Sequence, residues 1–130
     1  MDFFLARKIT KTTFSDLTEK VKQELKKEGF GVITEIDIQK TLKEKINVDF
    51  RKYLILGACN PQFAHRALLA EDKIGVLLPC NVVIQETTAG ELEVLAFDPS
   101  SAMMDMGNPE LVELSTDLRH KLQHVLENLD

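Results

Sequence analysis

Two Cys-Asn pairs are the residues in this sequence whose types and spacing could do chemistry. Cys59-Asn60 ends the apolar run that starts at Tyr53, and Cys80-Asn81 precedes the apolar segment 82–84. A run of seven apolar residues is too short to cross a membrane and has the length of a strand buried on both faces. The pairs therefore stand at the ends of two predicted central strands, and Cys59, Asn60, Cys80 and Asn81 are our candidate ligand-binding residues.

The two cysteines admit two interpretations. If their strands are antiparallel neighbours, the thiols would lie close enough for a redox pair or a metal site, and either thiol could be a nucleophile. The other interpretation is that they fill tight strand ends, because free cysteine is among the most buried residue types. We favour the second, since there is no CxxC motif and a nucleophile needs a base within reach. His65, the nearest histidine, falls on the polar side of its predicted helix.

The two asparagines have different explanations. Asn60 precedes Pro61, which is typical of a helix N-cap followed by proline in the first turn. Asn81 lies inside an apolar segment and caps nothing there. A buried amide must find hydrogen-bond partners, so we expect Asn81 to bind the backbone of a neighbouring loop. The alternative is that Asn81 binds a small ligand.

Two further groups of residues could form a site. The last predicted helix carries acidic residues and histidines three and four positions apart, a spacing that could chelate zinc: Glu113, Asp117, His120 and His124. No cysteine or third histidine completes a site, so we interpret this face as a solvent-exposed polar stripe and assign no metal. Methionines suit irregular apolar contacts, and we expect those of the preceding loop to fill core or meet a second subunit: Met103, Met104 and Met106.

Hydrophobic periodicity predicts the elements that must position these residues. Apolar residues three and four apart indicate two long helices, one ended by Gly29 and one opened by Asn108-Pro109. The predicted strands are residues 3–9, 31–36, 53–59, 82–84 and 92–97, and the predicted helices are residues 14–28, 37–46, 61–72 and 109–129. Strands in series with flanking helices indicate an α+β fold, an antiparallel sheet with the two long helices on one face.

Length and composition indicate one ordinary globular domain. A chain of 130 residues can form a single core, so we predict one domain over residues 1–130. Its 44% hydrophobic and 28% charged residues are typical of globular proteins, and no apolar window approaches the length of a membrane span. The first residues lack a basic leader, so we expect a cytoplasmic protein with reduced thiols.

The charge distribution argues against nucleic-acid binding. The net charge is -5, made up of +3 over residues 1–85 and -8 over residues 86–130. Binding to phosphate requires clustered positive charge, which this balance does not supply. One basic group stands out, but acidic residues interrupt it and we interpret it as a solvated helix face: Lys40, Lys43, Lys45, Arg51 and Lys52.

The residues around the two pairs resemble a known family. The run Gly57-Ala-Cys-Asn-Pro61, then Ala64 and Ala67-Leu68, then the run from Gly75 to Val83 are similar to the signature of the domain of unknown function family 302 (DUF 302). The resemblance covers essentially the whole chain. It implies a fold like that of the TATA-binding-protein superfamily, β-α-β4-α with an added helix at about residues 61–72, and a homodimer. It does not imply DNA binding, because function resides in sites rather than folds.

Two functional hypotheses follow. The first is a non-catalytic homodimeric module that binds a small, partly apolar ligand or a protein partner near the edge formed by Cys59, Asn60, Cys80 and Asn81. The alternative is a thiol-dependent redox or metal-binding protein that uses the two cysteines. We assign no catalytic residue and no cofactor, since the sequence assembles no acid–base or nucleophile set. Because the central strands are apolar on both faces, we expect the short helices and a second subunit to cover the face away from the long helices.

Overall fold

The chain forms one five-stranded antiparallel sheet in the order β1-β5-β4-β3-β2. The computed structural model describes residues 3–130. The strands are β1 (Phe4–Ile9), β2 (Gly31–Asp37), β3 (Tyr53–Cys59), β4 (Cys80–Glu86) and β5 (Leu92–Phe97). The predicted central strand 53–59 is thus confirmed, and its predicted antiparallel pairing with the strand at Cys80 is observed as β3 beside β4.

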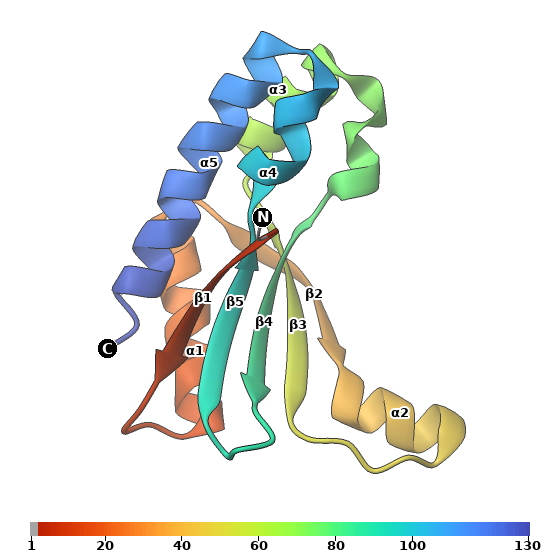
Figure 1. Ribbon diagram of the computed structural model, residues 1–130, viewed down its shortest axis with the longest axis vertical. Helices are drawn as coiled ribbons and strands as arrows, with labels where there is room; N and C mark the ends of the chain where they lie inside the picture. Colours follow the sequence, from red (N-terminus) through yellow and green to blue (C-terminus); the bar gives the residue numbers. More distant parts are fainter. Residues whose placement is uncertain (1–2) are drawn as a thin grey trace.

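Five α-helices and two short 3₁₀ segments accompany the sheet in the described part of the chain. They are α1 (Phe14–Lys27), α2 (Ile38–Ile46), α3 (Pro61–Ala70), η1 (Asp72–Leu77), α4 (Pro99–Met103), η2 (Met104–Met106) and α5 (Pro109–Glu127). In Figure 1, α1 lies behind the strands, α3 and α4 stand beyond one end of the sheet with the upper part of α5, and α2 projects beside β2 at the other end. The predicted α+β class and the β-α-β4-α order are confirmed, with α2, α3 and α4 added between those elements.

Capping side chains fix where the helices begin. The side chain of Thr13 accepts a hydrogen bond from the Asp16 N–H at the start of α1, and Asn60 accepts one from the Phe63 N–H at the start of α3. These bonds satisfy amide groups that the first turn leaves free. The prediction of a methionine-rich loop is wrong, because residues 99–103 form α4 with the Asp98 side chain as its cap.

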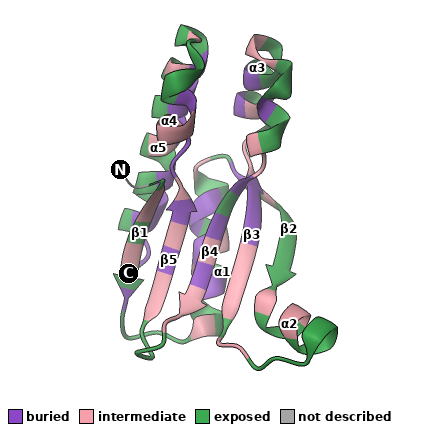
Figure 2. Cartoon of the chain, turned by 45° about the vertical axis from the view of Figure 1, so that its right-hand side comes forward, coloured by how far each residue is buried: buried purple, intermediate pink, exposed green. Residues whose placement is uncertain are grey.

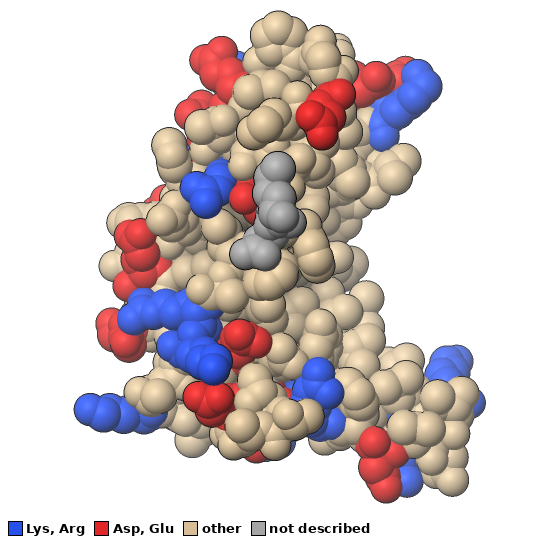
Figure 3. Space-filling model, in the orientation of Figure 1, with Lys and Arg blue, Asp and Glu red and all other residues tan. Residues whose placement is uncertain are grey.

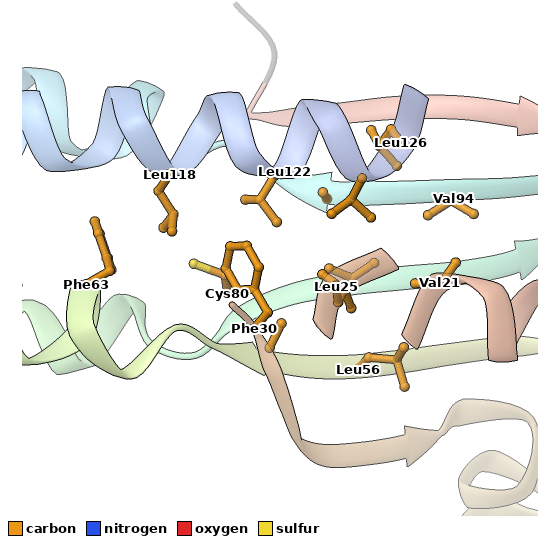
Figure 4. Packing of buried hydrophobic residues seen from close by; sticks show 14 of the residues in the cluster. Val21, Leu25, Phe30, Leu56, Phe63, Cys80, Val94, Leu118, Leu122 and Leu126 are labelled. Carbon is orange, nitrogen blue, oxygen red and sulfur yellow. The ribbon is translucent and has the colours of Figure 1, made fainter. Parts of the chain in front are cut away.

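The core lies between α1, α5 and one face of the sheet. Every second residue of the central strands points to this face, and these residues pack against the apolar stripes of both long helices (Figure 4). The strand residues are Leu56, Ala58, Cys80, Val82, Ile84, Val94 and Ala96, and the helix residues include Leu17, Val21, Leu25, Leu118, Leu122 and Val125. This packing is the expected result of a period of two in strands meeting a period of 3.6 in helices.

A partly buried ion pair ties the end of the sheet to α5. The Asp98 side chain, which is 11% exposed, accepts hydrogen bonds from the Ser100 N–H and hydroxyl and from the Arg119 guanidinium at 3.1 Å. Burial alone would raise the pKa of Asp98, but the bonds from Ser100 and Arg119 outweigh it and lower that pKa. The carboxylate therefore stays ionised and fixes the position of α4 against α5.

The opposite face of the sheet has no helix across its centre among residues 3–130 (Figure 1). The expectation that the short helices cover it is wrong for α2, which buries none of its residues and projects away from the strands (Figure 2). Among the helical segments of residues 3–130, η1 is the one that approaches this face, at the end of β4. The uncovered surface, which we call the open face, is where a cavity lies.

Candidate functional site

A pocket of about 480 Å³ lies on the open face, between the sheet and η1. Most of its lining is apolar. It is formed by Phe3, Phe4, Tyr53, Val76, Leu77, Leu78, Pro79, Asn81, Val83, Gln85, Leu95, Ala96 and Phe97. Figure 3 shows this side of the molecule, where uncharged residues make up most of the centre and right of the view and the outline is hollowed between the upper and lower parts.

Strand register brings the floor of the pocket together. Val83 of β4 is opposite Ile55 of β3 and Leu95 of β5, and Phe97 of β5 is opposite Phe4 of β1. Residues directly opposite each other in antiparallel strands share a face of the sheet. Four strands therefore contribute one continuous apolar floor, which no single segment of the sequence reveals.

Asn81 lies at the η1 end of this pocket. The expectation that Asn81 is buried and bonded to a loop is wrong: its side chain is exposed, and it makes no hydrogen bond within the described residues. The register places it opposite Gly57, on the open face. Its amide therefore offers a free donor and a free acceptor beside an apolar surface.

Gly57 allows two neighbouring segments to pack closely against β3 at this end of the open face. A Cβ built on Gly57 would lie 2.9 Å from Cγ of Pro79 and would overlap the Thr34 hydroxyl. Thr34 comes from β2 and Pro79 precedes β4, so both neighbouring segments approach the backbone of β3 at this residue. Glycine is the residue type that permits such an approach.

The other end of the pocket carries a polar network. The Arg51 guanidinium donates from Nε and Nη2 to Oε1 of Gln85, at 3.2 and 3.1 Å. Gln85 in turn donates from Nε2 to the Glu93 carboxylate at 2.9 Å. The guanidinium also lies 4.5 Å from the centroid of the Phe50 ring. This network was not predicted from the sequence, because Arg51, Gln85 and Glu93 come from three segments that meet only in the sheet.

Cys80 is separated from the pocket by the sheet itself. Its side chain is 3% exposed, and Figure 4 shows its sulfur directed into the cluster that includes Phe30 and Leu122. Cys80 is opposite Ala58 on the core face, so alternation places the adjacent Cys59 on the other face. Burial, with a smaller contribution from Cys59, raises the pKa of Cys80 to about 12. A thiol with that pKa is protonated at neutral pH and is a poor nucleophile or metal ligand.

Comparison with known proteins adds the family. A family model described as "Domain of unknown function DUF302" matches residues 6–129. The chain belongs to the DUF302 family. A crystal structure of an uncharacterized conserved DUF302 protein from Bacillus stearothermophilus is 29% identical to it, with a TM-score of 0.90 and coverage of 98% of each chain. No curated protein matches this sequence.

The DUF302 chain does not bring the four candidate residues into one site. Asn81 lines the pocket, Cys80 is in the core, and Cys59 is half-buried at the end of β3. Asn60 acts as the cap of α3 and lines a different cleft, between α3, α5 and the end of α1. Of the four, Asn81 is the one that lines the open-face pocket.

The remaining candidates of this DUF302 domain lie elsewhere. His65 is exposed on α3, and His124 lies 3.2 Å from the Glu28 carboxylate, which links α5 to the end of α1. Within residues 3–130 no group of three or more His, Cys, Asp or Glu side chains could hold a metal ion. In the same residues no helix has the length and apolarity needed to span a bilayer.

We expect Cys80 to resist alkylation in the folded protein. With a pKa of about 12, its thiolate fraction at pH 8 is about one in ten thousand, and its reaction rate should rise about tenfold per pH unit until the thiol ionises. Mass spectrometry after iodoacetamide treatment, with and without denaturant, measures this. Cys80→Ala identifies the signal of Cys59. Equal rates for Cys80 in the folded and unfolded chain at pH 8 would contradict the prediction.

Proposed function

We propose that this DUF302 domain is a non-catalytic binding module and that its open-face pocket holds a small, partly apolar ligand. The observation that supports this most directly is the pocket itself, an apolar concavity on a sheet face that the chain's helices leave uncovered. Its volume of about 480 Å³ falls in the range of small-molecule sites. Asn81 supplies the precisely placed polar group that such sites use to orient a ligand.

The shape of the pocket favours an elongated molecule. Asn81 and Gln85 both line it and lie on the same face of β4, and four residues of a strand span about 13 Å. Polar groups therefore stand at the two ends, with Val83 and Leu95 between them. An elongated ligand with a largely apolar body and a polar head group matches this arrangement.

The composition of the lining favours binding over catalysis. Among the described lining residues, Tyr53 has the only titratable side chain, and the other polar groups are the amides of Asn81 and Gln85. Amides orient ligands through hydrogen bonds but do not exchange protons near neutral pH. The thiol alternative has no support from this geometry, because Cys80 is buried on the other face.

A neutral solvatochromic dye tests the pocket without assuming a ligand. Val83→Trp should fill the floor, so we expect the affinity for Nile red to fall at least about tenfold relative to the unchanged protein. Leu69→Trp is the control, because Leu69 is 75% exposed and does not line the pocket. Fluorescence titration measures both, and circular dichroism checks that each variant is folded. Unchanged dye affinity in Val83→Trp would contradict the proposal.

We also propose that the module is a homodimer that associates through β2 and α2. Four large aliphatic residues are exposed on these elements and the loop after them: Ile33 (61%), Ile36 (45%), Ile46 (63%) and Val48 (41%). β2 is an edge strand, and exposed edges readily add a strand from another chain. A second copy of this chain offers the same aliphatic surface, as a two-fold interface requires.

Sedimentation equilibrium at micromolar concentration tests this association. We expect a dimeric mass for the unchanged chain and a monomeric mass for the double variant Ile33→Ser, Ile36→Ser. Leu69→Ser is the control, because Leu69 is 75% exposed on α3, which stands beyond the end of the sheet opposite to α2 (Figure 1). A monomeric mass of the unchanged chain would refute the dimer and leave the pocket proposal intact.

A further inference from the structure

We infer that the ligand of the open-face pocket is a straight-chain monocarboxylate whose carboxylate binds Arg51. This inference rests on the proposed function, since it names the ligand class of the same pocket. It follows from the position of Arg51, from the partners that its guanidinium lacks, and from the separation of charged and apolar ends along the pocket floor.

Arg51 is half-buried and has no carboxylate partner. Its side chain makes no ion pair within the described residues, and its hydrogen bonds there all go to one neutral acceptor, Oε1 of Gln85. A guanidinium has five N–H donors, and those of Nη1 have no hydrogen-bond partner in the part of the chain described. Buried charges are normally paired, and no carboxylate among the described residues pairs with Arg51. Arg51 is therefore a cation that lacks an anion.

The surroundings of Arg51 hold the guanidinium in place. It lies 4.5 Å from the centroid of the Phe50 ring and 5.8 Å from that of Tyr53. Glu93 accepts a hydrogen bond from the Gln85 amide nitrogen, which leaves the amide oxygen of Gln85 to face Arg51. The nearest carboxylate in this network thus orients Gln85 and does not neutralise Arg51. A preorganised guanidinium is suited to a planar anion, and a carboxylate can accept two parallel N–H bonds from it.

One end of the pocket lies beside the charged Arg51, whereas at the other end apolar residues surround the uncharged amide of Asn81. Arg51 contacts Gln85 and Tyr53, which line the pocket and are opposite each other in the sheet. Four residues along β4, about 13 Å away, the lining becomes apolar around Asn81: Val76, Leu77, Leu78, Pro79 and Phe97. A carboxylate at Arg51 would direct a hydrocarbon chain over Val83 and Leu95 towards this end. Decanoate has a comparable extended length.

The test compares decanoate with decanol by isothermal titration calorimetry, below the concentration at which either aggregates. Arg51→Gln should weaken decanoate binding about tenfold to hundredfold, the effect of losing a charge-assisted hydrogen bond, and leave decanol binding unchanged. Lys45→Gln is the matched control, since it removes the same charge from exposed α2. Arg51→Lys keeps the positive charge but removes the planar guanidinium that can donate two parallel hydrogen bonds. We expect its affinity for decanoate to lie between those of the unchanged protein and Arg51→Gln. Thermal melts check that each variant is folded.

The outcomes separate the inference from the proposed function. Equal binding of decanoate and decanol, with no effect of Arg51→Gln, would overturn the carboxylate assignment and keep an apolar pocket. Decanoate binding that is weakened by Arg51→Gln but not by Val83→Trp would place the anion outside the pocket and also overturn the assignment. An unchanged affinity for Nile red in Val83→Trp would contradict the proposed function itself. This result is separate from the result for Arg51→Gln, because the dye carries no carboxylate.

Discussion

Replacing Leu118 by Ala is expected to lower the free energy of unfolding by about 2–5 kcal/mol, the cost of a cavity in a packed core. Leu118 is 2% exposed on α5, where it belongs to the cluster that joins both long helices to the sheet (Figure 4). Its removal leaves a void that three elements border, so the surrounding structure cannot collapse around it easily. Urea denaturation followed by circular dichroism measures the change.

His120→Ala on the same helix is the control. His120 is exposed two residues after Leu118, so we expect a change within about 0.5 kcal/mol. Equal losses for the two substitutions would show that the face of α5 that carries Leu118 does not pack against the core. A loss for Leu118→Ala below about 1 kcal/mol would mean that the core relaxes into the space.

Replacing Gly57 by Ala is expected to be similarly costly for a different reason. The added methyl group would overlap the Thr34 hydroxyl and lie 2.9 Å from Cγ of Pro79, so β2 or the start of β4 must move. Overpacking of this kind costs about 1–3 kcal/mol. Gly31→Ala is the matched control on β2, because a Cβ there meets no atom within 4 Å.

A second substitution tests the cause of that loss. Thr34→Ala removes the hydroxyl that the new methyl group overlaps and leaves Pro79 in place. The double variant Gly57→Ala, Thr34→Ala should therefore lose less free energy of unfolding than the two single variants lose together, because the effects of neighbouring sites that share a clash are not additive. Additive changes in chemical denaturation would show that Thr34 does not limit the space at Gly57.

Local signals in the sequence were sufficient for the strands, the long helices and the fold class. The apolar run 53–59 became β3 without a change of boundary, and the Asn60-Pro61 start of α3 was recognised from capping chemistry. The methionine-rich segment was misjudged, because Pro99–Met103 is a single turn of helix that is stabilised by its contact with α5 rather than by its own residues.

The candidate site was harder to predict, because it depends on which face of the sheet stays uncovered. The apolar strands indicated burial on both faces, but they could not show that residues of odd number on β3 and β4 face a pocket. Asn81 was therefore expected to be buried, and it is exposed. Arg51, Gln85 and Glu93 meet only through the pairing of three strands, which no local pattern in the sequence encodes.

The strand order gives β1 a special place in folding. β2, β3, β4 and β5 pair with their neighbours in the sequence, but β1 pairs with β5 at the far end of the sheet, with Phe4 opposite Phe97. Closing so long a loop costs entropy that the other pairings avoid. We therefore expect β1 to join a sheet whose other four strands have already paired.

That order of assembly affects the pocket, because Phe3 and Phe4 form one of its walls. Until the first strand docks, the sheet has a floor for a ligand but lacks that side. A bound ligand would favour the docked strand by mass action, so occupancy of the pocket and attachment of the chain's first strand are one coupled equilibrium. Amide hydrogen exchange in residues 4–9 would then slow as the ligand concentration rises.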